Sequence, residues 1–209
     1  MREHEAKIYS QNGEDGILAY ILGQIGTEYR TAVEFGAGNG LENNTRLLAD
    51  LGWLVYWFDF EELQYRPHRC EFSRQILTVD NIVSQFRALG VPTQFDVLSV
   101  DVDGNDWHLR EAIGAAFRPR VCVMEYNGSF AASDEYVMPR NDNYCWQPWQ
   151  KQFGASLLSL TQQATRLGYD LVYCESRGVN AFYVRSDINT LPVLSVDEAW
   201  RPLWWAQQV

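Results

Sequence analysis

YDLVYCESRGVNAFYVR, residues 169–185, contains two strand-like runs on either side of a short link. The first run covers residues 169–175 and the second covers residues 179–185, so only Ser176, Arg177 and Gly178 separate them. A link of three residues is too short for the crossover that joins two parallel strands. The two strands are therefore predicted to form an antiparallel hairpin.

Upstream of this hairpin, short apolar runs alternate with stretches of helical periodicity. Uninterrupted apolar runs are typical of strands that are buried on both faces. Strands that alternate with helices form right-handed crossovers. The chain is therefore predicted to be a single α/β domain, residues 1–209, whose doubly wound, mostly parallel sheet ends in the hairpin. The expected strands are residues 31–36, 53–59, 75–80, 95–101 and 120–126, and the expected helices are residues 15–25, 42–52, 81–89, 106–117 and 154–168.

The composition excludes several classes of protein. Of the 209 residues 46% are hydrophobic, and 17 basic against 27 acidic residues give a net charge of −10. Proteins that bind long nucleic acids usually have the opposite charge balance, and the basic stretch at residues 65–74 is interpreted as a solvated connector. No apolar run approaches the roughly 18 residues of a membrane span. The polar start does not resemble a secretion signal, so we expect a cytoplasmic protein. The four cysteines lack the spacing of zinc ligands.

A glycine-rich turn follows the first expected strand. In VEFGAGNG, residues 33–40, Gly36, Gly38 and Gly40 occupy alternate positions. A dinucleotide fingerprint requires a glycine where this chain has Leu41, and no lysine follows that could hold a phosphate. Glycines allow the backbone to approach a ligand closely. The turn fits a cofactor with an amino-acid moiety, such as S-adenosylmethionine (SAM), and a tight turn with no ligand is the alternative.

Acidic residues occur where a bound nucleoside would need them. Asp59 lies about twenty residues after the glycine turn, the spacing at which a carboxylate accepts hydrogen bonds from ribose hydroxyls. Glu61 is the second candidate for this role, and an exposed acid with no ligand is the alternative for Asp59. Asp80, after the third expected strand, is placed near an adenine amino group. Glu34, inside the end of the first strand, is a further candidate cofactor residue.

The stretch FDVLSVDVDGNDW, residues 95–107, brings three aspartates together after the fourth expected strand. Asp101 and Asp103 are expected at the same sheet edge as Glu125 and Asn127, which end the fifth strand. Oxygen ligands of this kind suit magnesium, manganese or calcium, so the four side chains form a candidate metal site. Asp106 is assigned instead to the start of the following helix, where the helix dipole stabilises an acid.

The same acids have a possible role in proton transfer. Asp103 or Glu125 is a candidate general base for a hydroxyl nucleophile, and a divalent cation would lower the pKa of that hydroxyl. Asp101 has a second interpretation, in which its carboxylate accepts hydrogen bonds from a cofactor ammonium group. His108 is a further candidate base, with a partly buried structural histidine as the alternative.

Several segments form a distinctive ordered set. They are SQNGEDGIL (10–18), VEFGAGNGLENNTRLL (33–48), DVLSVDVDGND (96–106), RVCVMEYN (120–127), FGASL (153–157) and GVNAFYVR (178–185). Together they resemble the FkbM-like family of class I SAM-dependent methyltransferases, from about residue 10 to residue 186.

This resemblance implies a Rossmann-like fold of seven strands in the order 3-2-1-4-5-7-6, and O-methylation of a small molecule, sugar or glycan. It places Gln11 and Glu14 near the amino-acid end of the cofactor, where a plain polar cap for the first helix is the alternative. Two other functions stay open. They are a SAM-binding regulatory or scaffold protein without turnover, and a nucleotide-binding oxidoreductase.

A long connection follows the fifth strand. Residues 127–153 are rich in aromatic side chains, which argues against disorder and favours a lid on the substrate side. A packed surface loop without a substrate role is the alternative. The tryptophans of the tail, Trp200, Trp204 and Trp205, favour a homodimer contact. The candidate substrate residues of the lid are Tyr136, Arg140, Trp146 and Trp149.

Overall fold

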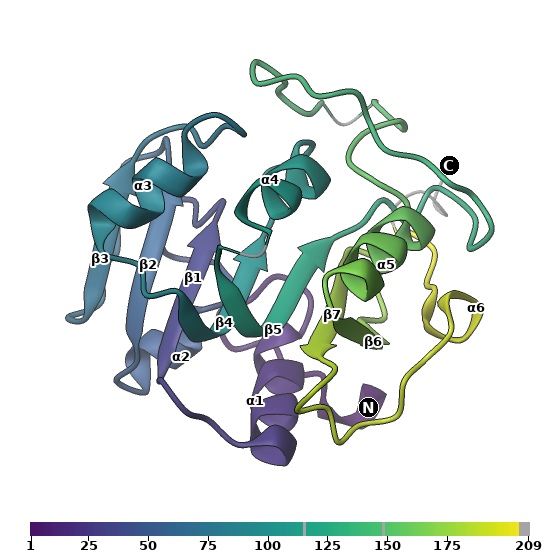
Figure 1. The fold of residues 1–209 in the computed structure, drawn as a ribbon, viewed down its shortest axis with the longest axis horizontal. Helices are drawn as coiled ribbons and strands as arrows, with labels where there is room; N and C mark the ends of the chain where they lie inside the picture. Colours follow the sequence, from purple (N-terminus) through teal and green to yellow (C-terminus); the bar gives the residue numbers. More distant parts are fainter. Residues whose placement is uncertain (115, 148, 205–209) are drawn as a thin grey trace.

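The computed structural model describes residues 1–114, 116–147 and 149–204 (Figure 1). Its seven strands form one sheet in the order β3-β2-β1-β4-β5-β7-β6, as predicted. All neighbouring strands are parallel except at β7, which pairs antiparallel with both β5 and β6. The predicted α/β class and the closing hairpin are therefore confirmed. The strands are β1 (Thr31–Phe35), β2 (Leu54–Asp59), β3 (Cys70–Arg74), β4 (Gln94–Val100), β5 (Arg118–Glu125), β6 (Tyr169–Cys174) and β7 (Asn180–Arg185).

Helices cover both faces of the sheet. Successive residues of a strand point to opposite faces, so Ala32 of β1 packs with α1 and α2 while Val33 packs with α3, α4 and α5. Each face therefore has its own apolar core, which explains why the strands read as continuous apolar runs. The helices are α1 (Glu14–Ile25), α2 (Arg46–Asp50), α3 (Ile82–Leu89), α4 (Asp106–Ile113), α5 (Leu157–Arg166) and α6 (Val196–Ala199), with a 3-10 turn at Arg2–His4.

The third strand differs from the prediction. It was expected at residues 75–80, whereas β3 lies at Cys70–Arg74, inside the stretch interpreted as a connector. β3 is an edge strand that pairs only with β2, so part of its surface faces solvent and polar residues are tolerated. Within the range expected for the strand, Leu77 is buried in the core, whereas Ile76 is 60% exposed.

Two helices are shorter than predicted. The helix expected at residues 42–52 is only the five-residue α2, because Asn43 and Asn44 belong to the buried loop before it. The helix expected at residues 106–117 ends at Ile113, since Gly114 has a positive φ of 33°. No helix in the described ranges combines the length and apolar character that a membrane span requires.

The tail packs partly against the protein itself. The indole Nε1 of Trp200 donates to the carbonyl of Phe130 at 2.9 Å. Trp204 is 39% exposed, and its ring lies 5.0 Å from the Arg177 guanidinium. Trp205 lies outside the described residues. The homodimer contact stays a prediction.

Candidate functional site

The three glycines of the first turn have different surroundings. A Cβ built on Gly36 would lie 1.6 Å from the carbonyl oxygen of Asp101, and one on Gly40 would lie 2.2 Å from the carbonyl oxygen of Tyr65. These two glycines are required because the backbone of a neighbouring segment fills the space. A Cβ on Gly38 would meet no atom within 4 Å, although its φ is also positive at 55°. Gly38 thus faces open space at the end of β1.

Asp59 lies beside this open position. Its Oδ2 accepts a hydrogen bond from the Gly38 amide at 2.7 Å, and its Oδ1 accepts one from the Glu61 amide at 2.8 Å. Each carboxylate oxygen has further acceptor capacity. The next residue, Phe60, is 65% exposed. Phe60 was not among the predicted site residues. Its signal in the sequence is its position, because it is a large apolar residue directly after the strand-end acid Asp59.

Glu34 has an internal role in the structure. Its side chain is 1% exposed and accepts hydrogen bonds from the amides of Asn44 and Thr45 and from the Thr45 hydroxyl. Burial raises the pKa of this carboxyl to about 7. Glu34 therefore holds the loop before α2 against β1 and supports the glycine turn from within.

The segment before α1 crosses to the hairpin. Glu14 is fully buried, and its Oε1 accepts from the side-chain amide of Asn180, the first residue of β7, at 2.9 Å. Gln11 is exposed at the surface of the same segment. Asp15 accepts four hydrogen bonds through Oδ2, from three amides and one hydroxyl of residues 8–10. Glu14 thus lies inside the protein near the end of the sheet, and Gln11 lies outside.

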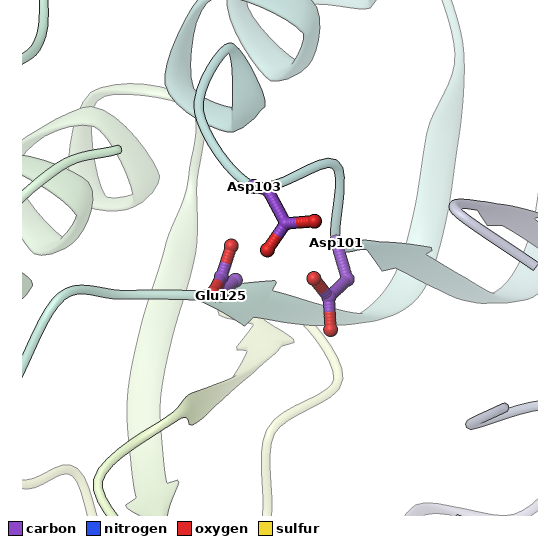
Figure 2. A group of neighbouring side chains, drawn as sticks. All are labelled: Asp101, Asp103 and Glu125. Carbon is purple, nitrogen blue, oxygen red and sulfur yellow. The ribbon is translucent and has the colours of Figure 1, made fainter. Parts of the chain in front are cut away.

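Three carboxylates meet at the ends of β4 and β5, as Figure 2 shows. Asp101 follows β4, Asp103 lies in the loop before α4, and Glu125 is the last residue of β5. One carboxylate oxygen from each lies within 4.8 Å of the other two. The backbone of Asp103 has a positive φ of 59°, which is uncommon for a residue other than glycine. The predicted convergence of these three acids is confirmed.

The cluster lacks a positive partner in the described part of the chain. None of the ion pairs found among the described residues involves Asp101, Asp103 or Glu125. Burial and the repulsion of Asp103 raise the pKa of Asp101, while burial and the repulsion of Asp101 raise that of Glu125. Burial also raises the pKa of Asp103. A bound cation would remove this mutual repulsion.

Asp106 is separate from the cluster. It is 1% exposed, and its two oxygens accept from the amides of Val102 and Gly104 at 2.8 and 2.9 Å. Burial raises the pKa of Asp106 to about 7. Asp106 is the first residue of α4, as predicted, but its hydrogen bonds go to amides of the loop before the helix and burial outweighs the helix dipole. Its hydrogen bonds order the loop that presents Asp103.

Asn127 and His108 are directed to the lid. The side-chain amide of Asn127 donates to the carbonyls of Lys151 and Phe153, and its oxygen accepts from the Ser129 amide. Nε2 of His108 lies 2.8 Å from the carbonyl oxygen of Met138. Neither side chain reaches toward the three acids through these bonds. The geometry corrects the predicted fourth metal ligand and favours the structural interpretation of His108.

The lid lies against the loop that carries Asp103. A Cβ on Gly104 would be 2.6 Å from the Tyr144 ring and 3.0 Å from the Met138 methyl group. The side chain of Asn105 exchanges hydrogen bonds with the backbone of Asn141 at 2.9 and 3.1 Å. The lid, drawn in green at the upper right of Figure 1, is therefore seated on the loop between β4 and α4.

Tyr144 is a lid side chain that responds to the charges of the cluster. Burial, together with the charges of Asp103 and Glu125, raises the pKa of Tyr144. Its hydroxyl donates to Gln150 at 3.0 Å within the lid. The sequence does not indicate this role, because nothing in the aromatic pattern of the lid distinguishes Tyr144 from its neighbours.

The predicted substrate residues are spread over the lid. Arg140 donates to Asp80 and Asp142, each with a shortest contact of 2.6 Å, so it links the lid to the loop after β3. Asp80 is exposed and is engaged in this ion pair. Tyr136 stacks on Phe130 with ring centroids 4.4 Å apart. Trp146 is partly buried and packs edge-on against Phe153, whereas Trp149 is 75% exposed.

Comparison with known proteins gives information on the fold. No family model and no curated protein matches the chain. Among solved structures, a protein of Lactococcus lactis described as a "putative hemolysin" superposes with a TM-score of 0.52. The two chains are 12% identical, and the match covers 92% of this chain and 95% of the other. At this identity the likeness shows a shared α/β architecture alone.

Proposed function

We propose that the chain is a SAM-dependent methyltransferase that methylates a hydroxyl group of a small molecule, sugar or glycan. The observation that carries the proposal is the placement of an open glycine position and a ribose-type acid beside three converging carboxylates that form no ion pair with any described residue. SAM carries positive charges on its sulfonium and ammonium groups. A group of carboxylates with surplus negative charge is complementary to such a cofactor.

The residues present fit SAM at each of its parts. Asp59 keeps acceptor capacity on both oxygens for ribose hydroxyls while it holds the Gly38 amide. The exposed ring of Phe60 offers a flat apolar surface for adenine. Asp101, at the end of β4 against Gly36, would accept from the ammonium group. The open space at Gly38 lets the cofactor approach the backbone.

The chemistry is divided between the cofactor and the protein. When bound, SAM supplies an electrophilic methyl group. Asp103 and Glu125 are candidate bases for the acceptor hydroxyl, since burial raises the pKa of both carboxyls and a carboxylate with a raised pKa accepts a proton more readily. Tyr144 and Met138 cover the adjoining loop, so the lid would keep water away from this position.

Calorimetric titration with S-adenosylhomocysteine tests the cofactor. We expect binding in the micromolar range, and Asp59→Asn should weaken it at least about tenfold, which corresponds to about 1.4 kcal/mol. Glu62→Gln is the matched control, since this carboxylate is 84% exposed, and it should leave the affinity unchanged. Absence of binding at tens of micromolar, or stabilisation against heat by NAD in its place, would refute the proposal.

Transfer itself is tested with SAM that carries a labelled methyl group and a panel of hydroxylated small molecules and sugars. Methyl transfer by the native protein, together with its loss in Asp103→Ala and Glu125→Ala, would support the proposal that the protein is a methyltransferase. Tight cofactor binding with no transfer to any acceptor, and with no effect of these two substitutions on function, would identify a SAM-binding protein without turnover.

A further inference from the structure

We infer that Asp101, Asp103 and Glu125 form a binding site for one hard divalent cation, such as Mg²⁺, Mn²⁺ or Ca²⁺. Metal binding itself needs only these residues. The role given to the cation in catalysis rests on the proposed methyltransferase function.

The distances suit a single ion. One oxygen from each carboxylate lies within 4.8 Å of the other two. Oxygen ligands lie at about 2.0–2.1 Å from Mg²⁺ and at about 2.3–2.6 Å from Ca²⁺, so two ligands on opposite sides of an ion are about 4–5 Å apart. The three carboxylates can therefore reach one ion through small side-chain rotations, without movement of β4 or β5.

A second observation points to a missing positive group. Glu125 is only 9% exposed, and its Oε2 is buried without a hydrogen-bond partner. Asn180 lies opposite Glu125 in the antiparallel pair of β5 and β7, so the two side chains share one face of the sheet. The Oδ1 of Asn180 is likewise buried without a partner, and this residue is 2% exposed. Two buried acceptors without partners at one strand pair lower the stability of the fold unless a ligand supplies the missing interaction.

The protein does not supply the counter-charge from its own described side chains. Arg140, the arginine of the adjoining lid, is engaged by Asp80 and Asp142. Asp106, which holds the amides of Val102 and Gly104, fixes the loop so that Asp103 is presented beside Asp101. The acids are thus arranged in advance, and a cation is the group that completes them.

Three protein ligands leave part of the coordination sphere open. Hard cations of this size accept six or more oxygen atoms, so water or an acceptor hydroxyl can occupy the other positions. A hydroxyl bound to a divalent cation loses its proton at a lower pH. A carboxylate oxygen of Asp101, Asp103 or Glu125 that does not face the ion would be placed to accept the proton of the acceptor hydroxyl.

Titration of the EDTA-treated protein with Mn²⁺, followed by electron paramagnetic resonance of the free ion, tests the site. We expect one strongly bound Mn²⁺ per chain, in competition with Mg²⁺ or Ca²⁺. Asp103→Asn and Glu125→Gln should each weaken binding at least tenfold. Glu135→Gln changes an exposed lid carboxylate outside the cluster and should leave the affinity unchanged.

Thermal melting separates loss of the site from loss of the fold. Without metal, Glu125→Gln should melt at the same or a higher temperature than the native protein, since the substitution removes a repelling charge. Only the native protein and Glu135→Gln should gain melting temperature when Mn²⁺ is added. No binding at millimolar Mn²⁺, or equal binding by the native protein and both cluster variants, would overturn the site.

The cofactor titration distinguishes the two proposals. If S-adenosylhomocysteine binds but Mn²⁺ does not, the metal site is wrong and the methyltransferase proposal stands. If Mn²⁺ binds to the cluster but S-adenosylhomocysteine does not bind in either the presence or the absence of metal, the metal site stands and the proposed function is wrong.

Discussion

Gly36 and Gly38 lie in the same turn, but their substitution should have different consequences. An alanine at position 36 would place its Cβ against the carbonyl of Asp101 and would keep a φ of 74°. We expect Gly36→Ala to cost more than about 3 kcal/mol of unfolding free energy, through the clash and the left-handed backbone. Gly38→Ala keeps the fold at a cost of about 1–2 kcal/mol, and it should also weaken cofactor binding because the Cβ enters the open space.

Urea denaturation of the native protein, Gly36→Ala and Gly38→Ala checks the order of stability. Titration with S-adenosylhomocysteine checks whether Gly38→Ala weakens cofactor binding. Gly23 provides the control, since it lies within α1 and a Cβ there would meet nothing within 4 Å. Gly23→Ala should stabilise the protein by about 0.5–1 kcal/mol without any change in affinity. Equal effects at positions 36 and 38 would contradict this account of the turn.

The individual residues of the acidic cluster could be predicted because strand ends are easy to locate. Asp101 and Glu125 follow apolar runs, and parallel neighbours bring such residues to one edge. The sequence could not indicate that Asn127 turns to the lid, because this depends on where the carbonyls of Lys151 and Phe153 lie. The same holds for Asn180, whose unsatisfied oxygen is apparent only from its surroundings.

At the scale of secondary structure, one buried acid joins several elements at the amino-terminal end of a central strand, opposite the strand ends that carry the acidic cluster. Asp96, near the start of β4, accepts hydrogen bonds from the amides of Glu28, Tyr29 and Arg30 before β1. It also forms an ion pair at 3.1 Å with Arg120 of β5, whose side chain is 7% exposed. Asp96 thereby fixes the loop after α1 against two central strands.

Asp96→Asn should lower the free energy of unfolding by about 3–5 kcal/mol, because it removes the nearest countercharge of the buried Arg120 and leaves only the exposed Glu28, 3.9 Å away. Equilibrium unfolding in urea measures the change. Glu28→Gln is the matched control, since Glu28 is 59% exposed and lies 3.9 Å from the same guanidinium. It should change the stability by less than about 1 kcal/mol. A similar loss in both variants would show that Asp96 has no special role.

The elements that the sequence located well are those with both faces buried. β1, β2, β4 and β5 have continuous apolar runs because helices pack on both faces of the sheet, and the edge strand β6 was located because it too is almost entirely buried. β3 was misplaced because this edge strand is only partly buried, and its sequence, CEFSR, resembles a polar loop. The short α2 was overestimated because Asn43 and Asn44 look like helix caps, whereas they line the buried interior of the turn.

For the whole molecule, buried acids set the dependence of stability on pH. Burial raises the pKa of Glu34 and of Glu175 to about 7, compared with 4.5 for an ordinary glutamate. The folded protein therefore binds these protons more tightly than the unfolded chain. Stability from these groups is fully present below about pH 4.5 and is lost as the pH rises through about 7.

We expect the free energy of unfolding to fall between about pH 5 and pH 8, with each group contributing about 1–3 kcal/mol. Urea denaturation across this range measures the slope, and Glu175→Gln should reduce it. Acids whose pKa is lowered by arginines, such as Glu111 and Asp187, act below this range. A stability that rises steadily from pH 5 to pH 8 would contradict the prediction.

The antiparallel insertion of β7 also has a consequence for synthesis. β5 ends at Glu125, but its outer neighbour begins only at Asn180, after the whole lid and the next helix and strand. A ribosome adds about 5–20 residues per second, so β5 emerges several seconds before the strand that covers its edge. An uncovered apolar edge can pair with another chain. On one messenger RNA, nascent chains on neighbouring ribosomes therefore carry uncovered β5 edges at the same time, and these edges can pair with one another.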